Sequence, residues 1–313
     1  MKKLVAAFLS MMLAVCLSVS AVTLFASAAS GTDLAVADDP TYTTTVDLKG
    51  ENVADDFVAV FAAADGSVTA GKATDIWDYD AENGTFTSKE SLVTNEDVWS
   101  DFYYLYYTGA DYQNFYMEVT LTHQSGRAGW SGLAYGVQDV TKPAKGATEN
   151  PFGGLSFVQG DGKYTWHNPK VNATEWNDTG IVATGFNGLT DTVHKLKVYD
   201  GHMQYWLNDE ANVVVDVAVP EGGLTAGKVG IAVTNKAVAV KSIKITRLND
   251  EGKAGSDGAE DIVIPESLQV TGITDGQNAV VGTPIAVSTA ISPAGASQAV
   301  SFSSDPAGAS YAD

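Results

Sequence analysis

Aromatic rings, amides and carboxylates lie close together in one turn-rich stretch of the sequence, and a further indole precedes it. These residues are Trp130, Tyr164, Trp166, His167, Asn168, Trp176, Asn177 and Asp178. A flat ring can pack against the apolar face of a pyranose, and amide or carboxylate groups can hydrogen-bond to the sugar hydroxyls. The combination predicts a site that binds a glycan or polysaccharide.

Trp176 is the first choice within this group, because the polar neighbours Glu175 and Asn177 place it on a loop. An alternative stays open for Trp130 and Trp166. Large indoles in a β-sandwich commonly point into the core, and these two would then stabilise the fold rather than bind a ligand.

Hydrolysis of a glycosidic bond needs two carboxyl groups that flank it. Glu118 stands alone on its predicted strand, and no acidic partner lies at the right spacing around Asp216. Glu118 and Asp139 remain a pair that a sheet could bring together. Since the chain has 38 Asp and Glu residues, such pairs carry little weight, and we assign no catalytic residue.

The four histidines do not have the spacing of metal ligands, and Cys16 is the only cysteine. Both observations argue against a zinc site. Calcium is the one cofactor that stays open. The oxygen-rich segment 75–80 and the pair Asn177 and Asp178 have ligands that suit a hard cation.

The N-terminus has the pattern of a secretory signal peptide. Lys2 and Lys3 precede an apolar run that ends at Phe25, and small residues follow, so we expect residues 1–29 to be removed by cleavage near Ala28 and Ala29. No later run is apolar over the roughly 18 residues of a spanning helix, so we expect no membrane insertion of the mature chain. The expected location is outside the cell, either secreted or on the cell surface in association with the wall.

Charge and glycine content narrow the class further. The formal net charge is −20, which argues against a nucleic-acid partner held by a basic surface. The 31 glycines and the short alternating segments favour strands and turns over helices. The sequence therefore predicts an all-β protein.

Two segments carry the clearest strand patterns. Residues 114–122 alternate apolar and polar side chains, as expected for a strand with one buried face. Residues 193–207 predict a hairpin in which Asp200 and Gly201 form a type I′ turn. At the start of the domain, Val53, Phe57 and Phe61 fit a short helix, although a strand is nearly as consistent with them.

The strands of residues 41–248 resemble those of concanavalin A-like and laminin-G-like jelly-roll domains. The resemblance is carried by the segments 76–86, 112–119, 194–201, 227–232 and 240–245. They are similar to domains named for 3-keto-disaccharide hydrolases and to lectin-like modules of secreted glycosidases. The Glu-x-Asp-x-x-Glu pattern of concanavalin A-like glucanases is missing. The resemblance implies a jelly-roll sandwich.

Residues 262–313 resemble the beginning of a bacterial immunoglobulin-like domain of group 2, with Phe302 where that family usually has Trp. The resemblance implies a partial Ig-like β-sandwich. We expect a flexible leader over residues 30–40 and a linker over residues 249–261, because neither segment contains enough apolar residues to form a core.

These patterns favour a carbohydrate-binding or adhesion module without catalysis. Two alternatives stay open: a glycan-processing hydrolase or lyase of the keto-disaccharide type, and a structural surface protein that binds another protein.

Overall fold

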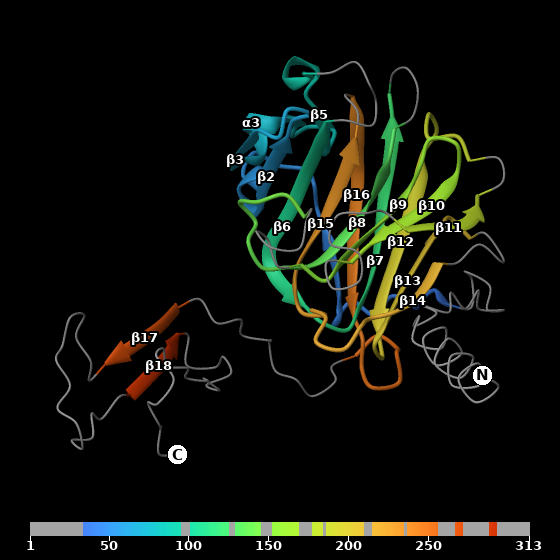
Figure 1. Cartoon of the computed structure of the whole chain (residues 1–313). Coiled ribbons are helices and arrows are strands. Elements are labelled where there is room, and N and C mark those ends of the chain that lie inside the picture. Colours follow the sequence, from blue (N-terminus) through green and yellow to red (C-terminus); the bar gives the residue numbers. More distant parts are fainter. Residues whose placement is uncertain are drawn as a thin grey trace, which may run out of the picture.

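A computed structural model of the chain shows two antiparallel sheets stacked as a sandwich, so the predicted all-β, jelly-roll-type fold class is confirmed (Figure 1). The structure describes residues 34–94, 101–124, 129–144, 152–168, 177–183, 186–209, 215–234, 237–255, 267–271 and 288–292. Among these residues, no helix is long and apolar enough to cross a bilayer.

Sheet A has the strand order β14-β13-β12-β7-β16-β5-β4, and β1 also pairs with β16. Its strands are β1 (Thr43–Val46), β4 (Trp77–Asp80), β5 (Thr85–Ser88), β7 (Phe115–His123), β12 (Thr192–Tyr199), β13 (His202–Leu207), β14 (Val215–Ala218) and β16 (Val238–Arg247). Sheet B has the order β11-β10-β9-β8-β15-β6-β2-β3. Its strands are β2 (Phe57–Ala62), β3 (Val68–Lys72), β6 (Phe102–Tyr112), β8 (Ser131–Val137), β9 (Gly154–Val158), β10 (Lys163–His167), β11 (Asn177–Val182) and β15 (Gly227–Thr234).

Successive strands often change sheet, as β6, β7 and β8 do, and this produces the crossed connections of a jelly roll. The main core lies between the two sheets. On β7, Phe115, Met117, Val119 and Leu121 point into this core, which confirms the alternation read from the sequence. The opposite face of β7 carries Tyr116 and Glu118.

Short helical elements connect the strands. The sequence left a helix and a strand open at the start of the domain, and the structure contains both: a 3-10 helix, η1 (Val53–Asp56), leads directly into strand β2. Helix α3 (Ala73–Ile76) follows β3, and η2 (Glu90–Leu92) follows β5. The predicted hairpin also forms, with Asp200 at φ 49° and Gly201 at φ 70°.

A second apolar layer covers the outer face of sheet B. Tyr104 and Tyr106 stack there at 5.8 Å, and neither ring is exposed. The neighbouring strands carry small residues on this face. Gly132 lies beneath Phe157, and Gly230 lies beneath Tyr106, so that a Cβ at position 230 would come within 2.4 Å of the tyrosine ring. The tyrosines are therefore covered, and the loop that follows β8 contributes to the cover.

The sandwich does not close on itself, because β3 is an edge strand of sheet B. Four of its five residues are exposed, and Val68 has 49% of its surface accessible. Strands β17 (Ser267–Thr271) and β18 (Ser288–Ser292) pair with each other in a separate two-stranded sheet. They lie in the segment that resembles an Ig-like domain, whose identity stays a prediction.

Candidate functional site

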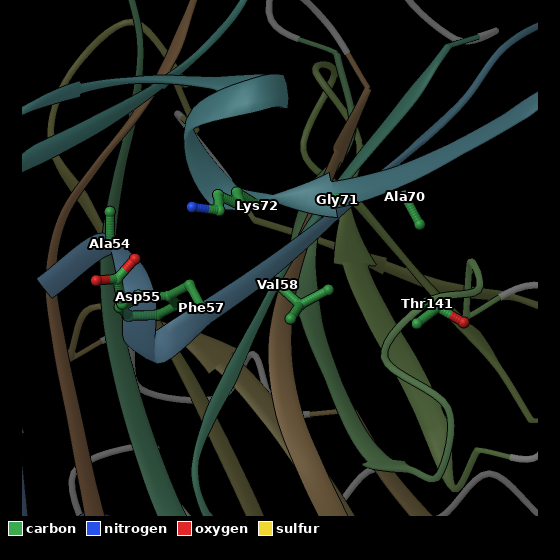
Figure 2. Close-up of a pocket in the computed structure, with 8 residues that line it drawn as sticks. All are labelled: Ala54, Asp55, Phe57, Val58, Ala70, Gly71, Lys72 and Thr141. Atoms are coloured by element: carbon green, nitrogen blue, oxygen red, sulfur yellow. The ribbon is translucent and has the colours of Figure 1, made fainter. Parts of the chain in front are cut away.

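An open groove of about 470 Å³ lies on the outer face of sheet B, beside its edge strand β3. Its walls come from η1, β2, β3 and the loop after β8. In Figure 2, Asp55 and Lys72 lie toward one end, Ala70 and Thr141 lie toward the other, and Val58 lies between them. The remaining lining residues are Ala54, Phe57 and Gly71.

Strand pairing explains why Val58 and Ala70 face the groove. Val60 belongs to the apolar layer on the outer face of sheet B, and Ala70 is its direct partner across the β2–β3 pair. Val58 lies two residues before Val60 and therefore shares its face. The floor of the groove is consequently aliphatic.

The loop after β8 forms the far wall, and two polar side chains fix it in place. Tyr106 donates a hydrogen bond to the carbonyl of Lys142 (3.1 Å) and accepts one from the backbone N–H of Ala144 (2.8 Å). Asp139 accepts hydrogen bonds from the backbone N–H (2.9 Å) and the hydroxyl (2.6 Å) of Thr141. The bond from the Thr141 hydroxyl is the main cause that lowers the pKa of Asp139.

The rim of the groove is polar and accessible. Asp55, Lys72 and Thr141 are all exposed, and they supply a carboxylate, an ammonium and a hydroxyl around the aliphatic floor. Such a groove can hold a small ring whose faces are apolar and whose edges carry hydrogen-bonding groups.

Two of the predicted ligand-binding residues lie in the main core. Tyr164 and Trp166 point between the sheets, and at most 2% of their surface is accessible. Strand β10 alternates, so these two rings share the inner face. For Trp166 the structure therefore supports the alternative in which the indole stabilises the fold, and neither ring is open to a saccharide.

His167 and Asn168 are also buried, but they lie toward the outer side of sheet B. The ring of His167 packs on Phe152 at 5.5 Å, and the amide of Asn168 donates to the carbonyl of Gly153 (2.7 Å). These contacts fix the chain that leads into β9. Both side chains are therefore occupied in positioning the backbone.

Trp130 keeps part of its indole accessible and packs on Phe157 at 5.6 Å. Asn177 and Asp178 begin β11, where their backbones pair with Trp166 and Thr165; their side chains lie outside the described part of the structure. Trp176 also lies outside the described residues and stays a prediction. The structure thus separates the predicted group and leaves Trp130 as its partly accessible ring within the described ranges.

Glu118 and Asp139 do not form a catalytic pair. Glu118 lies on the outer face of sheet A, where its carboxylate contacts Lys195 (3.6 Å) and Lys244. Asp139 follows β8 of sheet B. The two carboxylates belong to different sheets, so the pairing considered from the sequence is wrong.

The oxygen-rich segment 75–80 uses two of its carboxylates in local turns. Asp75 accepts from the backbone N–H of Lys72 (3.0 Å), and Asp80 accepts from the side chain of Asn83 (2.7 Å). Within the described ranges, no group of three or more His, Cys, Asp or Glu side chains is placed to hold a metal ion. A calcium site at residues 177–178 stays a prediction.

Sequence reasoning missed the groove because its residues carry no common pattern. Asp55, Val58, Ala70 and Lys72 come from the consecutive elements η1, β2 and β3, whereas Thr141 comes from the loop after β8. One signal was present: Val58 and Val60 alternate with inward-facing residues once β2 is read as a strand. The contribution of Thr141 depends on the tertiary fold.

No protein-family model matches the chain, and no curated protein matches its sequence. Several solved structures are similar in part. The carbohydrate-binding module CBM66 from Bacillus subtilis has a TM-score of 0.36 at 14% identity, over 51% of this chain and 84% of that one.

Two other solved structures give comparable values. The exoplasmic/lumenal domain of VIP36 with bound Ca²⁺ and Man2 has a TM-score of 0.44 at 11% identity, over 67% of this chain and 89% of that one. A putative glycosyl hydrolase from Parabacteroides distasonis has a TM-score of 0.37 at 18% identity, over 60% and 89% of the two chains.

Proposed function

We propose that the sandwich is a carbohydrate-binding module without catalysis, and that the groove beside β3 holds a sugar ring. The observation that carries the proposal is the groove itself, in which Val58 and Ala70 form an aliphatic floor and Asp55, Lys72 and Thr141 form a polar rim. The floor matches the C–H face of a pyranose, and the rim supplies donors and acceptors for its hydroxyls.

A groove that is open and lacks a fully exposed aromatic platform within the described residues binds a single sugar weakly. Weak sites gain strength when several modules are displayed together, because the second contact is then intramolecular. The leader sequence supports the further proposal that the mature chain acts outside the cell, where it binds to polysaccharides or cell walls.

The test is to fill the groove without unfolding the strand. In an Ala70→Trp variant, a large side chain enters the groove, and we expect retention on a glycan panel to fall at least about tenfold, which corresponds to 1.4 kcal/mol. The matched control is Thr69→Trp. Thr69 is also exposed on β3, but it pairs with Phe61 of the main core and therefore faces the other side.

Melting temperatures equal to that of the parent chain show that the fold of both variants is intact. Loss of retention in both variants, or in neither, would remove the groove from the proposal. The same incubation separates a binding module from the hydrolase or lyase alternative, because sugar or keto products released from the panel would require catalysis.

A further inference from the structure

The outer face of sheet A holds a second surface with the composition of a binding site. Tyr116 on β7 and Trp206 on β13 stack there with their ring centroids 5.7 Å apart and their planes at 16°. Both side chains are buried, although they lie outside the main core. Something other than the opposite sheet must therefore cover them.

Residues 34–38, which we call the strap, provide part of this cover, together with Tyr199 on β12. Leu34 and Val36 are half-buried and pack against the cluster formed by Tyr116, Trp206 and Leu248. Asp38 contributes the third contact, an ion pair with Lys244 on β16 at 2.9 Å. Part of the expected leader thus packs on the sandwich.

The strap is attached to the sheet through side chains. A turn follows it, in which the backbone N–H groups of Tyr42 and Thr43 bond to the carbonyl of Asp39, and β1 then pairs with β16. Among the described residues, no backbone hydrogen bond joins residues 34–38 to sheet A. The strap can therefore leave the sheet by rotation at the turn, while β1 stays in place.

Charged groups lie beside the two rings under and around the strap. The side chain of Lys195 is only 7% exposed and contacts Glu118 at 3.6 Å and Asp209 at 2.6 Å. Lys244 joins the same network through Glu118. The indole N–H of Trp206 is buried and has no hydrogen-bond acceptor within the described part of the chain. A buried donor without an acceptor is costly, and a ligand hydroxyl could supply the missing acceptor.

We propose that this face is a second glycan-binding site, and that the strap covers it by making the contacts that a bound glycan would make. The strap places aliphatic groups on the stacked rings and a carboxylate on Lys244. The sugar that replaces it must do both, so we infer a residue that carries a carboxylate, such as a uronic acid. This site lies on the sheet opposite the groove, and it does not depend on the groove's function.

Displacement has a measurable consequence. When a protein must open before it binds, the apparent affinity is reduced by the fraction of molecules that are open. Substitutions that release the strap should therefore raise the affinity, whereas substitutions at the ligand's own contacts should lower it.

The experiment uses the mature chain with Ala70→Trp, so that binding in the groove does not contribute. Isothermal titration compares a β-1,4-linked oligoglucuronate with a neutral cello-oligosaccharide of equal length. We expect the double variant Leu34→Ser/Val36→Ser to bind the oligoglucuronate at least about tenfold more tightly than the parent chain. Adding Lys244→Gln should reverse this gain for the oligoglucuronate and leave binding of the neutral probe unchanged.

Val68→Ser is the matched control, because it removes an exposed aliphatic side chain from the other sheet and should leave both affinities unchanged. Cleavage by thermolysin before Leu34 and Val36 gives a second measurement, and the oligoglucuronate should accelerate it in the parent chain. The proposal is overturned if release of the strap gives no gain, or if Lys244→Gln leaves the affinity for the oligoglucuronate intact while the melting temperature is unchanged.

Discussion

At the scale of single residues, the hydroxyl of Tyr106 connects the aromatic layer of sheet B to the wall of the groove. It is buried, and it bonds to both Lys142 and Ala144 in the loop after β8. Burial raises its pKa well above the ordinary value for a tyrosine, so the hydroxyl stays protonated and can donate. The position of Thr141 at the rim follows from this anchor.

Tyr106→Phe should therefore lower the free energy of unfolding by about 1–3 kcal/mol, since it leaves the N–H of Ala144 without this acceptor. Denaturant unfolding measures the loss. The matched control is Tyr107→Phe, a change in the next residue, whose hydroxyl has no hydrogen-bond partner among the described residues; its effect should stay within about 0.5 kcal/mol. Equal effects of the two substitutions would show that the hydroxyl of Tyr106 does not hold the loop.

Two buried histidines make stability depend on pH. Burial lowers the pKa of His123 from 6.5 to about 4. Burial, followed by the proximity of His123, lowers the pKa of His194 to about 3. Between these values and 6.5 the unfolded chain binds more protons than the folded one. The free energy of unfolding should therefore fall as the pH drops through this window, by up to about 1.4 kcal/mol per pH unit for each histidine.

A His123→Leu variant tests this dependence, because it removes one of the two titrating groups. Relative to the parent chain, it should gain about 2 kcal/mol more at pH 5 than at pH 8. Chemical denaturation at the two pH values measures the difference, in which the contribution of the many carboxylates cancels. The same gain at both pH values would contradict the role of His123 as a buried neutral group.

At the scale of elements, the central strands of sheet B depend on residues without large side chains. A Cβ at Gly132 would lie 1.9 Å from the carbonyl oxygen of Ser156 on the adjacent strand and 2.7 Å from the ring of Phe157. The first of these contacts is with backbone, which cannot rotate away. This close approach lets the aromatic layer lie flat over the sheet.

Gly132→Ala should accordingly cost about 3 kcal/mol of stability, at the upper end of the range for overpacking. Gly71→Ala on the edge strand β3 is the comparison, because its Cβ would meet the carboxylate of Asp75 at 2.6 Å, and this side chain can turn. We expect a loss of at most about 1 kcal/mol there. Thermal unfolding of both variants measures these losses of stability. A small loss for Gly132→Ala would show that β8 and β9 can separate at little cost.

Elements whose signals are local were predictable from the sequence. The alternation of β7 and the turn at Asp200 depend on neighbouring residues, and both were predicted. The orientation of β10 was not, because Trp166 is flanked by residues that suit either face. The groove was also beyond prediction, since Val58 and Thr141 meet only when β2, β6 and the loop after β8 are in place.

At the scale of the whole molecule, the sandwich and the last two described strands are separate hydrogen-bonded units. Strands β17 and β18 pair only with each other among the described residues. Residues 249–261 contain no large apolar residue. We therefore expect that the stability of the sandwich does not depend on the C-terminal segment.

A chain that spans residues 30–255 should unfold at the same temperature as one that spans residues 30–313, within about 2 °C. Calorimetry of the two proteins measures this. A clearly lower melting temperature for the shorter chain would show that the C-terminal segment stabilises the sandwich.

The exposed edge strand β3 has a consequence for handling the protein. Its outward backbone groups and the accessible Val68 form a margin along which another copy can continue the sheet. Purified material should accordingly self-associate as it is concentrated, and a lysine in place of this valine should keep it monodisperse to higher concentrations.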